Sequence, residues 1–243
     1  RPLVYCWRGG QRSGSFTIIL QQIGWRADTV EGGYMTWRRL VKQALYDTPI
    51  PHPLVLLDGN TGTAKTAILA KLAARGTQVI DLEGLAGHRG SLLGATAGGQ
   101  PDQKEFETTL AVALANLDPS KPIVVEAESS KIGQINLPPQ LWSAMQTAPR
   151  IMITAPIEAR SAFLEAAYAD IISNPEILAK QLKLLISIRG HAVVHSWLAL
   201  LEAGDFRGLA TALMEQHYDA AYDKSRGDDA REIIAHLGAQ TLD

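Results

Sequence analysis

Residues 53–66 read Pro-Leu-Val-Leu-Leu-Asp-Gly-Asn-Thr-Gly-Thr-Ala-Lys-Thr, an apolar run followed by a glycine-rich turn and a Lys-Thr pair. A buried strand that leads through such a turn into a helix directs backbone N–H groups and the positive helix end toward phosphate oxygens. In this pattern Lys65 bridges the terminal phosphates and Thr66 holds Mg²⁺. The sequence therefore predicts a phosphate-binding loop made of Gly59, Asn60, Thr61, Gly62, Thr63, Ala64, Lys65 and Thr66.

One residue of this loop departs from the usual pattern G-x-x-x-x-G-K-[ST]. Ala64 stands where the last glycine is usual. A methyl group is tolerated there if the residue is helical rather than left-handed. We therefore expect a helical Ala64 and a mildly weakened phosphate site. The alternative, an ordinary Gly/Thr turn, is disfavoured by the strand before the loop and the helix after it.

Composition limits the kind of protein. The 243 residues are 46% hydrophobic and 20% charged, enough for one large or two smaller globular domains. No apolar stretch reaches the roughly 20 residues that span a bilayer, and the first residues lack the features of a secretion signal. We therefore expect a cytoplasmic protein with no membrane partner. Cys6 is the only cysteine, which excludes an intrachain disulfide and a cysteine-based zinc site.

Charge is unevenly distributed along the chain. Arg and Lys outnumber Asp and Glu in residues 1–42, and the balance is reversed after Leu201. An anionic macromolecule is expected to dock near the basic N-terminal segment. The alternative is that these charges are only solvated surface groups.

The order of predicted elements indicates an α/β protein. Residues 1–46 read as strand 3–6, helix 13–23 and a helix that begins at Tyr34 or Thr36 and ends at Tyr46, before a proline-rich connection. From residue 47 to 174, strands at 53–58, 77–82, 122–127 and 150–154 alternate with helices at 65–75, 104–117, 138–147 and 156–171. This alternation predicts a parallel sheet with crossover helices. Residues 175–243 show only helical periodicity and are expected to form a helical C-terminal appendage.

Polar side chains follow two of the predicted strands. Glu126 and Glu128 end the strand at 122–127, and alternation places both on one side of it. The carboxyl end of a parallel strand lies beside the phosphate loop, so one of them is expected to hold Mg²⁺ or its water. After the strand at 77–82, a glycine-broken loop carries Asp81, Glu83, His88, Arg89 and Ser91, which suits substrate contact. The alternatives are a solvated strand end and a generic polar connection.

Cys6 opens a second candidate site. The loop that follows it carries Arg8, Gly9, Gly10 and Arg12. Its backbone N–H groups and the next helix N-terminus should stabilise a thiolate and lower the pKa of Cys6. The two arginines add positive charge for an anionic sulfur or selenium donor. The alternative is a buried, inert cysteine.

The segment Cys6-Trp7-Arg8-Gly9-Gly10-Gln11-Arg12-Ser13 resembles the active-site loop of rhodanese sulfurtransferases. Together with the phosphate loop behind it, the chain is similar to the tRNA 2-selenouridine synthase family, which joins a rhodanese domain to a P-loop domain. Further matches are Glu31-Gly32-Gly33-Tyr34, residues 81–91 and Glu128-Ser129-Ser130-Lys131-Ile132-Gly133, and they extend over most of the chain.

The resemblance implies a transferase that acts on the wobble uridine of tRNA. A 2-thiouridine is geranylated with geranyl diphosphate, and selenium from selenophosphate then replaces the geranylthio group. Cys6 is implied as the selenium-carrying residue, and the phosphate loop as the site of the prenyl donor's diphosphate. Ser129 and Lys131 are implied substrate contacts, and an enzyme that supplies selenophosphate is an expected partner.

The resemblance also implies domain boundaries. Residues 1–46 match only the C-terminal part of a rhodanese-like α/β domain, 47–174 a P-loop domain and 175–243 a helical region. We therefore expect an N-terminally truncated chain with an exposed strand edge and apolar surface in its first segment, and impaired selenation. Two other functions stay open: a P-loop ATPase or small-molecule kinase that uses Glu126 or Glu128, and a non-catalytic tRNA-binding fragment.

Overall fold

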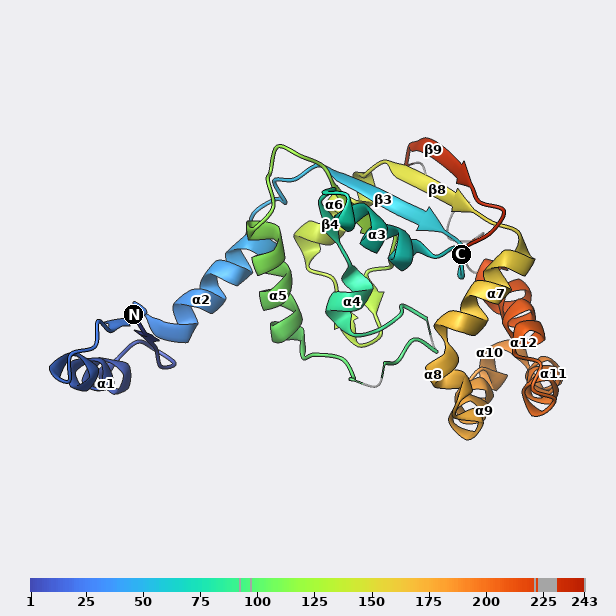
Figure 1. Ribbon diagram of the computed structural model, residues 1–243, viewed down its shortest axis with the longest axis horizontal. Helices are drawn as coiled ribbons and strands as arrows, with labels where there is room; N and C mark the ends of the chain where they lie inside the picture. The colour runs from blue at the N-terminus through green and yellow to red at the C-terminus, as the bar shows by residue number, and fades with distance from the viewer. Residues whose placement is uncertain (92, 97, 221, 223–230, 243) are drawn as a thin grey trace.

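The computed structural model describes residues 1–91, 93–96, 98–220, 222 and 231–242. Three parts lie along its longest axis (Figure 1). A small N-terminal unit with α1 (Gln11–Gln22) lies at one end, and α2 (Gly33–Lys42) connects it to a central sheet with its helices. Helices α9 (Pro175–Lys183), α10 (Ile186–Arg189), α11 (His191–Glu202) and α12 (Phe206–Leu213) form the other end.

The central sheet is parallel throughout, with the strand order β4-β5-β3-β8-β9. Its strands are β3 (Leu54–Gly59), β4 (Val79–Ile80), β5 (Ile123–Glu126), β8 (Arg150–Thr154) and β9 (Ile233–Gly238). The crossover helices are α3 (Lys65–Ala74), α4 (Leu82–Ala86), α5 (Gln103–Ala115) and α6 (Pro139–Thr147), followed by α7 (Ile157–Ala167) and α8 (Ala169–Ile172) after β8. The predicted α/β class is confirmed.

Both faces of the sheet are covered, which explains why its strands are continuous apolar runs. Leu56 and Val125 pack with Phe106 of α5 in the largest buried cluster. Leu57 and Val124, each adjacent to one of these residues in the same strands, pack on the other face with Leu69 of α3. This period of two assigns α5 and α6 to one face and α3 to the other.

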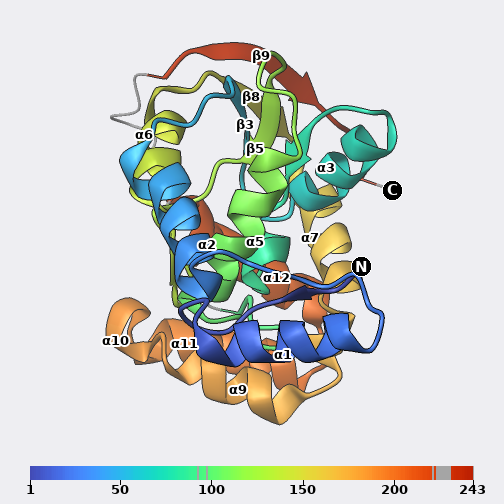
Figure 2. The same ribbon diagram turned by 90° about the vertical axis from the view of Figure 1, so that its left-hand side faces the viewer.

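The prediction of an exclusively helical tail is wrong in one respect. Residues of β9 pair with β8 as the fifth parallel strand, from Arg150 opposite Ile233 to Thr154 opposite Gly238 (Figure 2). Arg150 strengthens this edge: its side chain contacts Asp58 at 3.1 Å in a buried ion pair and donates to the Arg231 carbonyl at 3.3 Å. The tail therefore belongs partly to the sheet.

The helices of the tail form a core of their own. Leu178, Leu182, Trp197, Leu201 and Leu209 lie in one buried cluster. Below it, the chain continues into a π-helical turn, η2 (Met214–Tyr218). Arg160 of α7 is buried and donates to both carboxylate oxygens of Asp219, at 3.1 and 2.7 Å. This bidentate pair fixes the end of the tail helices against α7.

The N-terminal unit is small and incompletely covered. Its two parallel strands, β1 (Leu3–Val4) and β2 (Asp28–Thr29), lie against α1. Large apolar side chains are exposed on it, as the sequence predicts; they are Leu3, Tyr5, Trp7, Phe16, Ile18, Ile19, Ile23 and Trp25. The domain boundaries at residues 46 and 174 stay predictions.

A polar junction attaches α2 to α5, which lie side by side (Figures 1 and 2). Glu107 of α5 is 3% exposed and accepts from Arg38 of α2 at 2.5 Å. It also accepts from Tyr46 at 2.6 Å, in the π-helical turn η1 (Gln43–Asp47). Although burial opposes it, these hydrogen bonds lower the pKa of Glu107. The carboxylate therefore stays charged and holds the helix that carries the N-terminal unit.

Two smaller elements lie in the connections. A short antiparallel hairpin, β6 (Lys131–Ile132) with β7 (Ile135–Asn136), follows β5 and is absent from the sequence-based prediction. Across the described ranges, no helix combines the length and apolar character that a bilayer crossing requires.

Candidate functional site

The loop between β3 and α3 has the geometry that a phosphate cradle requires. Gly62 has φ of 85°, and a Cβ there would lie 3.0 Å from the Arg160 carbonyl oxygen of α7, so only glycine fits. Thr63 closes the turn, because its side chain donates to the Asn60 carbonyl at 2.8 Å. Lys65 begins α3 and donates to the Gly59 carbonyl at 2.7 Å. The ammonium group is thus held across the mouth of the loop.

The expectation of a helical Ala64 is wrong. This residue has φ of 59° and ψ of 28°, in the left-handed region, and is the only described non-glycine residue with positive φ. A Cβ in that region costs about 1 kcal/mol. The turn forces this conformation because α3 must begin immediately afterwards, with Lys65 directed back over the loop. The alanine is therefore strained rather than relaxed.

Replacing Ala64 with glycine is expected to stabilise the protein. The substitution removes the left-handed strain, although glycine also gains conformational entropy in the unfolded chain, so the net gain is about 0.5–1 kcal/mol. Thermal and urea unfolding measure it. The control is Ala74→Gly at the end of α3, where glycine should destabilise by a similar amount. Destabilisation by both substitutions would contradict the left-handed assignment.

Two carboxylates face the start of α3. Glu83 of α4 accepts from the Thr66 hydroxyl at 3.1 Å, and Glu128 lies beside Glu83. Burial first, and then the Glu83 charge, raise the pKa of Glu128, and burial raises the pKa of Glu83. Lys65 opposes both shifts. The pair therefore retains a proton to higher pH than an ordinary carboxyl, and sits next to the phosphate loop.

Glu126 lies elsewhere. It is fully buried at the end of β5, where it accepts from the Leu82 backbone N–H at 3.0 Å. Burial and the neighbouring Asp81 raise the pKa of Glu126 to about 9. Unlike Glu128, it is not among the residues that line the cleft. Its catalytic role stays a prediction, and its position is that of a neutral group that supports α4.

Glu126→Gln tests these two roles. A raised pKa in the folded protein means that folding stability decreases as pH rises from the ordinary range near 4.5 toward 9. Glutamine stays neutral and keeps an acceptor for Leu82, so the variant should gain stability over the parent by on the order of 1–3 kcal/mol at pH 8 and little at pH 5. Denaturant unfolding at both pH values measures this, with exposed Glu202→Gln as control. A gain that is independent of pH, or lost diphosphate binding, would contradict it.

The glycine-broken loop after β4 contributes further groups. Asp81 caps α4 by accepting from the Gly84 N–H at 2.6 Å. Arg89 pairs with Asp170 at 3.1 Å and lies 4.8 Å from the centre of the Tyr168 ring. Burial lowers the pKa of His88, which favours the neutral form of the ring. The loop is therefore anchored to α7–α8 rather than left as a simple connection.

The structure brings most predicted residues to one cleft of about 630 Å³. From the phosphate loop these are Thr61 to Thr66, and from the acidic and glycine-broken segments they are Asp81, Glu83, His88, Arg89, Ser91 and Glu128. Ser129 and Lys131 are not among the lining residues: the Ser129 hydroxyl donates to the Lys131 carbonyl at 2.6 Å in the turn before β6. Their substrate role stays a prediction.

Several residues of this site were missed by the sequence-based analysis. Tyr168, Tyr218 and Tyr222 line the cleft together with Leu164. The Tyr222 ring centre lies 5.9 Å from Lys65 Nζ, so one aromatic side chain of the tail lies over the lysine of the loop. No local motif marks these residues, since they come from helices whose periodicity indicates only an apolar face.

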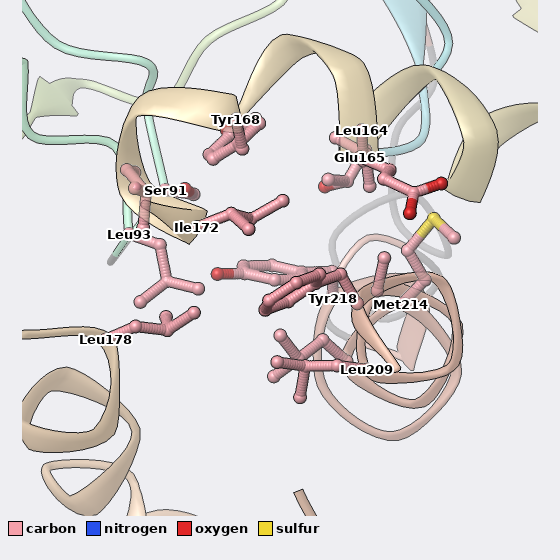
Figure 3. A pocket seen from close by; sticks show the side chains of 15 residues that line it. Ser91, Leu93, Leu164, Glu165, Tyr168, Ile172, Leu178, Leu209, Met214 and Tyr218 are labelled. Carbon is pink, nitrogen blue, oxygen red and sulfur yellow. The ribbon is translucent and has the colours of Figure 1, made fainter. Parts of the chain in front are cut away.

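An apolar cavity of about 70 Å³ adjoins the cleft (Figure 3). The two cavities share Thr61, Ser91, Leu164, Tyr168 and Tyr218 in their walls. Beyond these, the walls consist mainly of apolar side chains of α8, α9 and α12. A ligand whose phosphates lie in the loop can therefore extend an apolar group toward the tail helices.

Oxygen donors near Thr66 fit a magnesium ion. The Thr66 hydroxyl and the Glu83 and Glu128 carboxylates are the hard ligands that Mg²⁺ prefers, and few protein ligands suffice when substrate phosphates complete the shell. In the described part of the chain, no group of three or more His, Cys, Asp or Glu side chains could hold a metal. A protein-only metal cage is thus not seen there.

The Cys6 loop forms a separate site. A shallow cavity is lined by Cys6, Trp7, Arg8, Gly10, Gln11 and Arg12, and shares no lining residue with the phosphate cleft. Cys6 Sγ lies 3.3 Å from the Ser13 hydroxyl. Hydrogen bonds from the Ser13 side chain and backbone, and then from Arg8 and Gly10 N–H groups, lower the pKa of Cys6 to about 6. The predicted direction is confirmed, and the Ser13 side chain is its largest cause.

Comparisons with known proteins agree on one family. A family model described as the tRNA 2-selenouridine synthase AAA domain matches residues 52–184. A tRNA 2-selenouridine synthase of Alcanivorax borkumensis is 41% identical over 174 residues, 71% of this chain and 46% of the relative. Those of Shewanella halifaxensis and Hahella chejuensis are 38% and 40% identical, over 68% and 65% of this chain and 45% and 41% of each relative. The chain thus spans about half the length of the curated relatives it matches.

Proposed function

The chain belongs to the tRNA 2-selenouridine synthase family, and on that premise we propose that it modifies the wobble uridine of tRNA as a transferase. The proposed reaction converts 2-thiouridine to 2-selenouridine through a geranylated intermediate. Geranyl diphosphate and selenophosphate are the co-substrates, and tRNA is the macromolecular partner. A selenophosphate-supplying enzyme is a further proposed partner, and the cytoplasm the proposed location.

One observation carries the prenyl half of this proposal: the apolar cavity that adjoins the phosphate cleft. Geranyl diphosphate has a doubly phosphorylated head and a ten-carbon apolar chain, so it matches both compartments. The base and ribose of a nucleoside triphosphate carry many polar atoms, which an apolar cavity would leave without hydrogen bonds. The geometry thus favours a prenyl diphosphate over the ATPase alternative.

The phosphate loop would stabilise the leaving group. When the thiouridine sulfur bonds to C1 of the prenyl chain, the C1–O bond breaks and diphosphate leaves with additional negative charge. Backbone N–H groups of residues 59–66 and the Lys65 ammonium are placed where that charge develops. A Mg²⁺ ion held by Thr66 and Glu83 would add Lewis-acid stabilisation of the diphosphate, which leaves Glu128 to act on the base.

The same transfer requires loss of the N3 proton of the base. Glu128 is the best-placed acceptor, because it lines the cleft and its raised pKa makes it a stronger base than an ordinary carboxylate. Burial and then the charge of Glu83 raise the pKa of Glu128, so its ionised form binds a proton more strongly. This assignment keeps Glu128, and not Glu126, at the reacting atoms.

The selenium half is assigned to Cys6. Its thiolate form predominates at neutral pH because of the lowered pKa, and the exposed Arg8 and Arg12 side chains add positive charge to the same loop. The Cys6 cavity shares no lining residue with the phosphate cleft, so prenyl transfer and selenium transfer would occur at two separate sites. The modified base must therefore move from one site to the other. That movement fits a tRNA that stays bound by its backbone while the anticodon base changes position.

Mass spectrometry of nucleosides tests the function. The chain is incubated with 2-thiouridine-containing tRNA, geranyl diphosphate and Mg²⁺, with and without selenophosphate. A geranylated nucleoside is expected in both cases, and 2-selenouridine only with selenophosphate. If no geranylated product forms and the chain hydrolyses ATP without tRNA, the ATPase hypothesis is favoured instead. Salt-sensitive tRNA binding without any product would favour the tRNA-binding fragment.

A further inference from the structure

The adjoining apolar cavity is built largely by a region to which the sequence analysis assigned no chemistry. We propose that the closed end of this cavity, formed by Leu178 of α9 and Leu209 of α12, limits the length of the hydrocarbon chain that the site accepts. The inference rests on the proposed function and adds a specificity role for the C-terminal helices. The C-terminal helices would then bind the hydrocarbon chain, and the phosphate loop would bind the diphosphate.

The cavity has a mouth and a closed end. The mouth is defined by the residues shared with the phosphate cleft, among them Leu164, Tyr168 and Tyr218. Leu178 and Leu209 line only the apolar cavity, on the side of the tail helices (Figure 3). Each is 3% exposed and belongs to the buried cluster around Trp197. A chain that enters from the phosphate side therefore ends against the packed core of the helical region.

The cavity wall is suited to hydrocarbon. Glu165 lies at its rim, but its carboxylate is paired with Arg207 at 3.1 Å. The Thr61, Ser91 and Tyr218 side chains belong to the part of the wall that is shared with the cleft, and the rest of the wall is mainly leucine, isoleucine, phenylalanine and methionine, which offer water no hydrogen bonds. Apolar cavities of this kind stay dry and bind apolar ligands. Each methylene buried in one raises affinity about fourfold.

The apolar cavity is small compared with a ten-carbon chain, so the position of its closed end limits how much of the chain can enter. Its volume of about 70 Å³ is less than the roughly 150 Å³ that holds one benzene molecule. It accommodates the branched end of a chain, while the rest lies along the cleft toward the phosphate loop. A chain one isoprene unit longer must displace a closely packed leucine, which well-packed cores resist.

Leu209→Ala opens the closed end and is the principal test. Binding to the chain is measured by calorimetry in the presence of Mg²⁺ with three probes: inorganic diphosphate, geranyl diphosphate and farnesyl diphosphate. The parent is expected to bind geranyl diphosphate at least 10-fold more tightly than diphosphate and at least 10-fold more tightly than farnesyl diphosphate. In the variant, the preference for geranyl over farnesyl diphosphate should disappear, with diphosphate affinity unchanged.

Leu201→Ala is the matched control. Leu201 is buried in the same cluster but does not line the cavity, so its truncation destabilises the helices without lengthening the site. The ratio of geranyl to farnesyl affinity should stay as in the parent. Ala210→Leu, which adds volume to the cavity wall, is the second variant and should weaken geranyl diphosphate at least 10-fold while sparing diphosphate. It keeps the test decisive if Leu209→Ala unfolds.

The outcomes separate the inference from the function on which it rests. Normal diphosphate binding with no gain from the hydrocarbon overturns the cavity assignment and leaves the phosphate site standing. If Leu201→Ala and Leu209→Ala change the ratio of geranyl to farnesyl diphosphate affinity equally, Leu209 does not limit the length of the bound chain. Absence of binding for all three probes contradicts the phosphate site itself, and the inference with it.

Discussion

Replacing Lys65 with alanine is expected to lower the affinity for geranyl diphosphate and the rate of prenyl transfer each at least 100-fold. Lys65 begins α3, and its ammonium is held across the loop by the Gly59 carbonyl at 2.7 Å. The group therefore meets the diphosphate without reorganisation. Loss of one preorganised donor to a developing negative charge typically costs about 100–1,000-fold in rate. Calorimetry with geranyl diphosphate and timed nucleoside analysis measure the two effects.

Lys71→Ala is the matched control for this prediction. Lys71 lies on the same helix but is exposed and does not line the cleft. Its removal makes the same change in net charge and helix composition, so affinity and rate should stay within about twofold of the parent. Lys65→Arg should not restore activity, because the longer, planar guanidinium does not fit the space of an ammonium. Less than a threefold effect of Lys65→Ala would mean that the loop does not hold the diphosphate.

Replacing Cys6 with alanine is expected to abolish selenium incorporation while geranylation continues. The Cys6 loop and the phosphate cleft share no lining residue, so removal of the thiol leaves the prenyl site intact. The same nucleoside assay separates the two products. Accumulation of the geranylated nucleoside in the variant is the specific signature. Loss of both products would indicate that Cys6 supports the fold or tRNA docking rather than selenium transfer.

Ser13→Ala refines the prediction for Cys6. The Ser13 hydroxyl is the largest cause of the lowered pKa of Cys6, so its removal should raise that pKa from about 6 toward the ordinary value. A thiol with a pKa of 6 is about nine-tenths thiolate at pH 7, and one with a pKa of 8.5 only about 3%. Selenation should therefore slow up to about 30-fold at pH 7 and recover at pH 9.

The pH profile of cysteine alkylation by iodoacetamide measures this pKa directly. Ser15→Ala, an exposed serine of the same helix, is the control and should leave the profile unchanged. An unchanged profile in Ser13→Ala would assign the low pKa to the backbone N–H groups of the loop alone.

The sequence was sufficient to predict those elements whose structure is determined by residues that are neighbours in the chain. Strand β8 matches its predicted range, and β3 and α3 differ from theirs by one residue. The phosphate loop and the Cys6 loop each lie within one strand-turn-helix unit, so their geometry follows from a few consecutive residues. For the same reason the low pKa of Cys6 was predictable in direction.

Three features of the structure could not be predicted from neighbouring residues alone. Ala64 is left-handed at the residue directly before α3, whereas propensity favours a helical alanine. Glu126 and Glu128 were equivalent by alternation, but β5 ends at Glu126, so the two carboxylates enter different surroundings. Strand β9 is only six residues long and pairs with β8 about 80 residues earlier in the chain.

By itself, then, the sequence predicted the α/β class, the strand-turn-helix unit of residues 53–66 and the lowered pKa of Cys6, because each depends largely on contacts between residues close in the chain. The tertiary structure decided that Glu128 and not Glu126 lines the cleft, that the tail completes the sheet, and that α9 and α12 line an apolar cavity next to that cleft. An amphipathic helix reveals in its sequence that it has an apolar face. Which groups that face meets, and whether a space remains between them, depends on the packing of segments far apart in the chain.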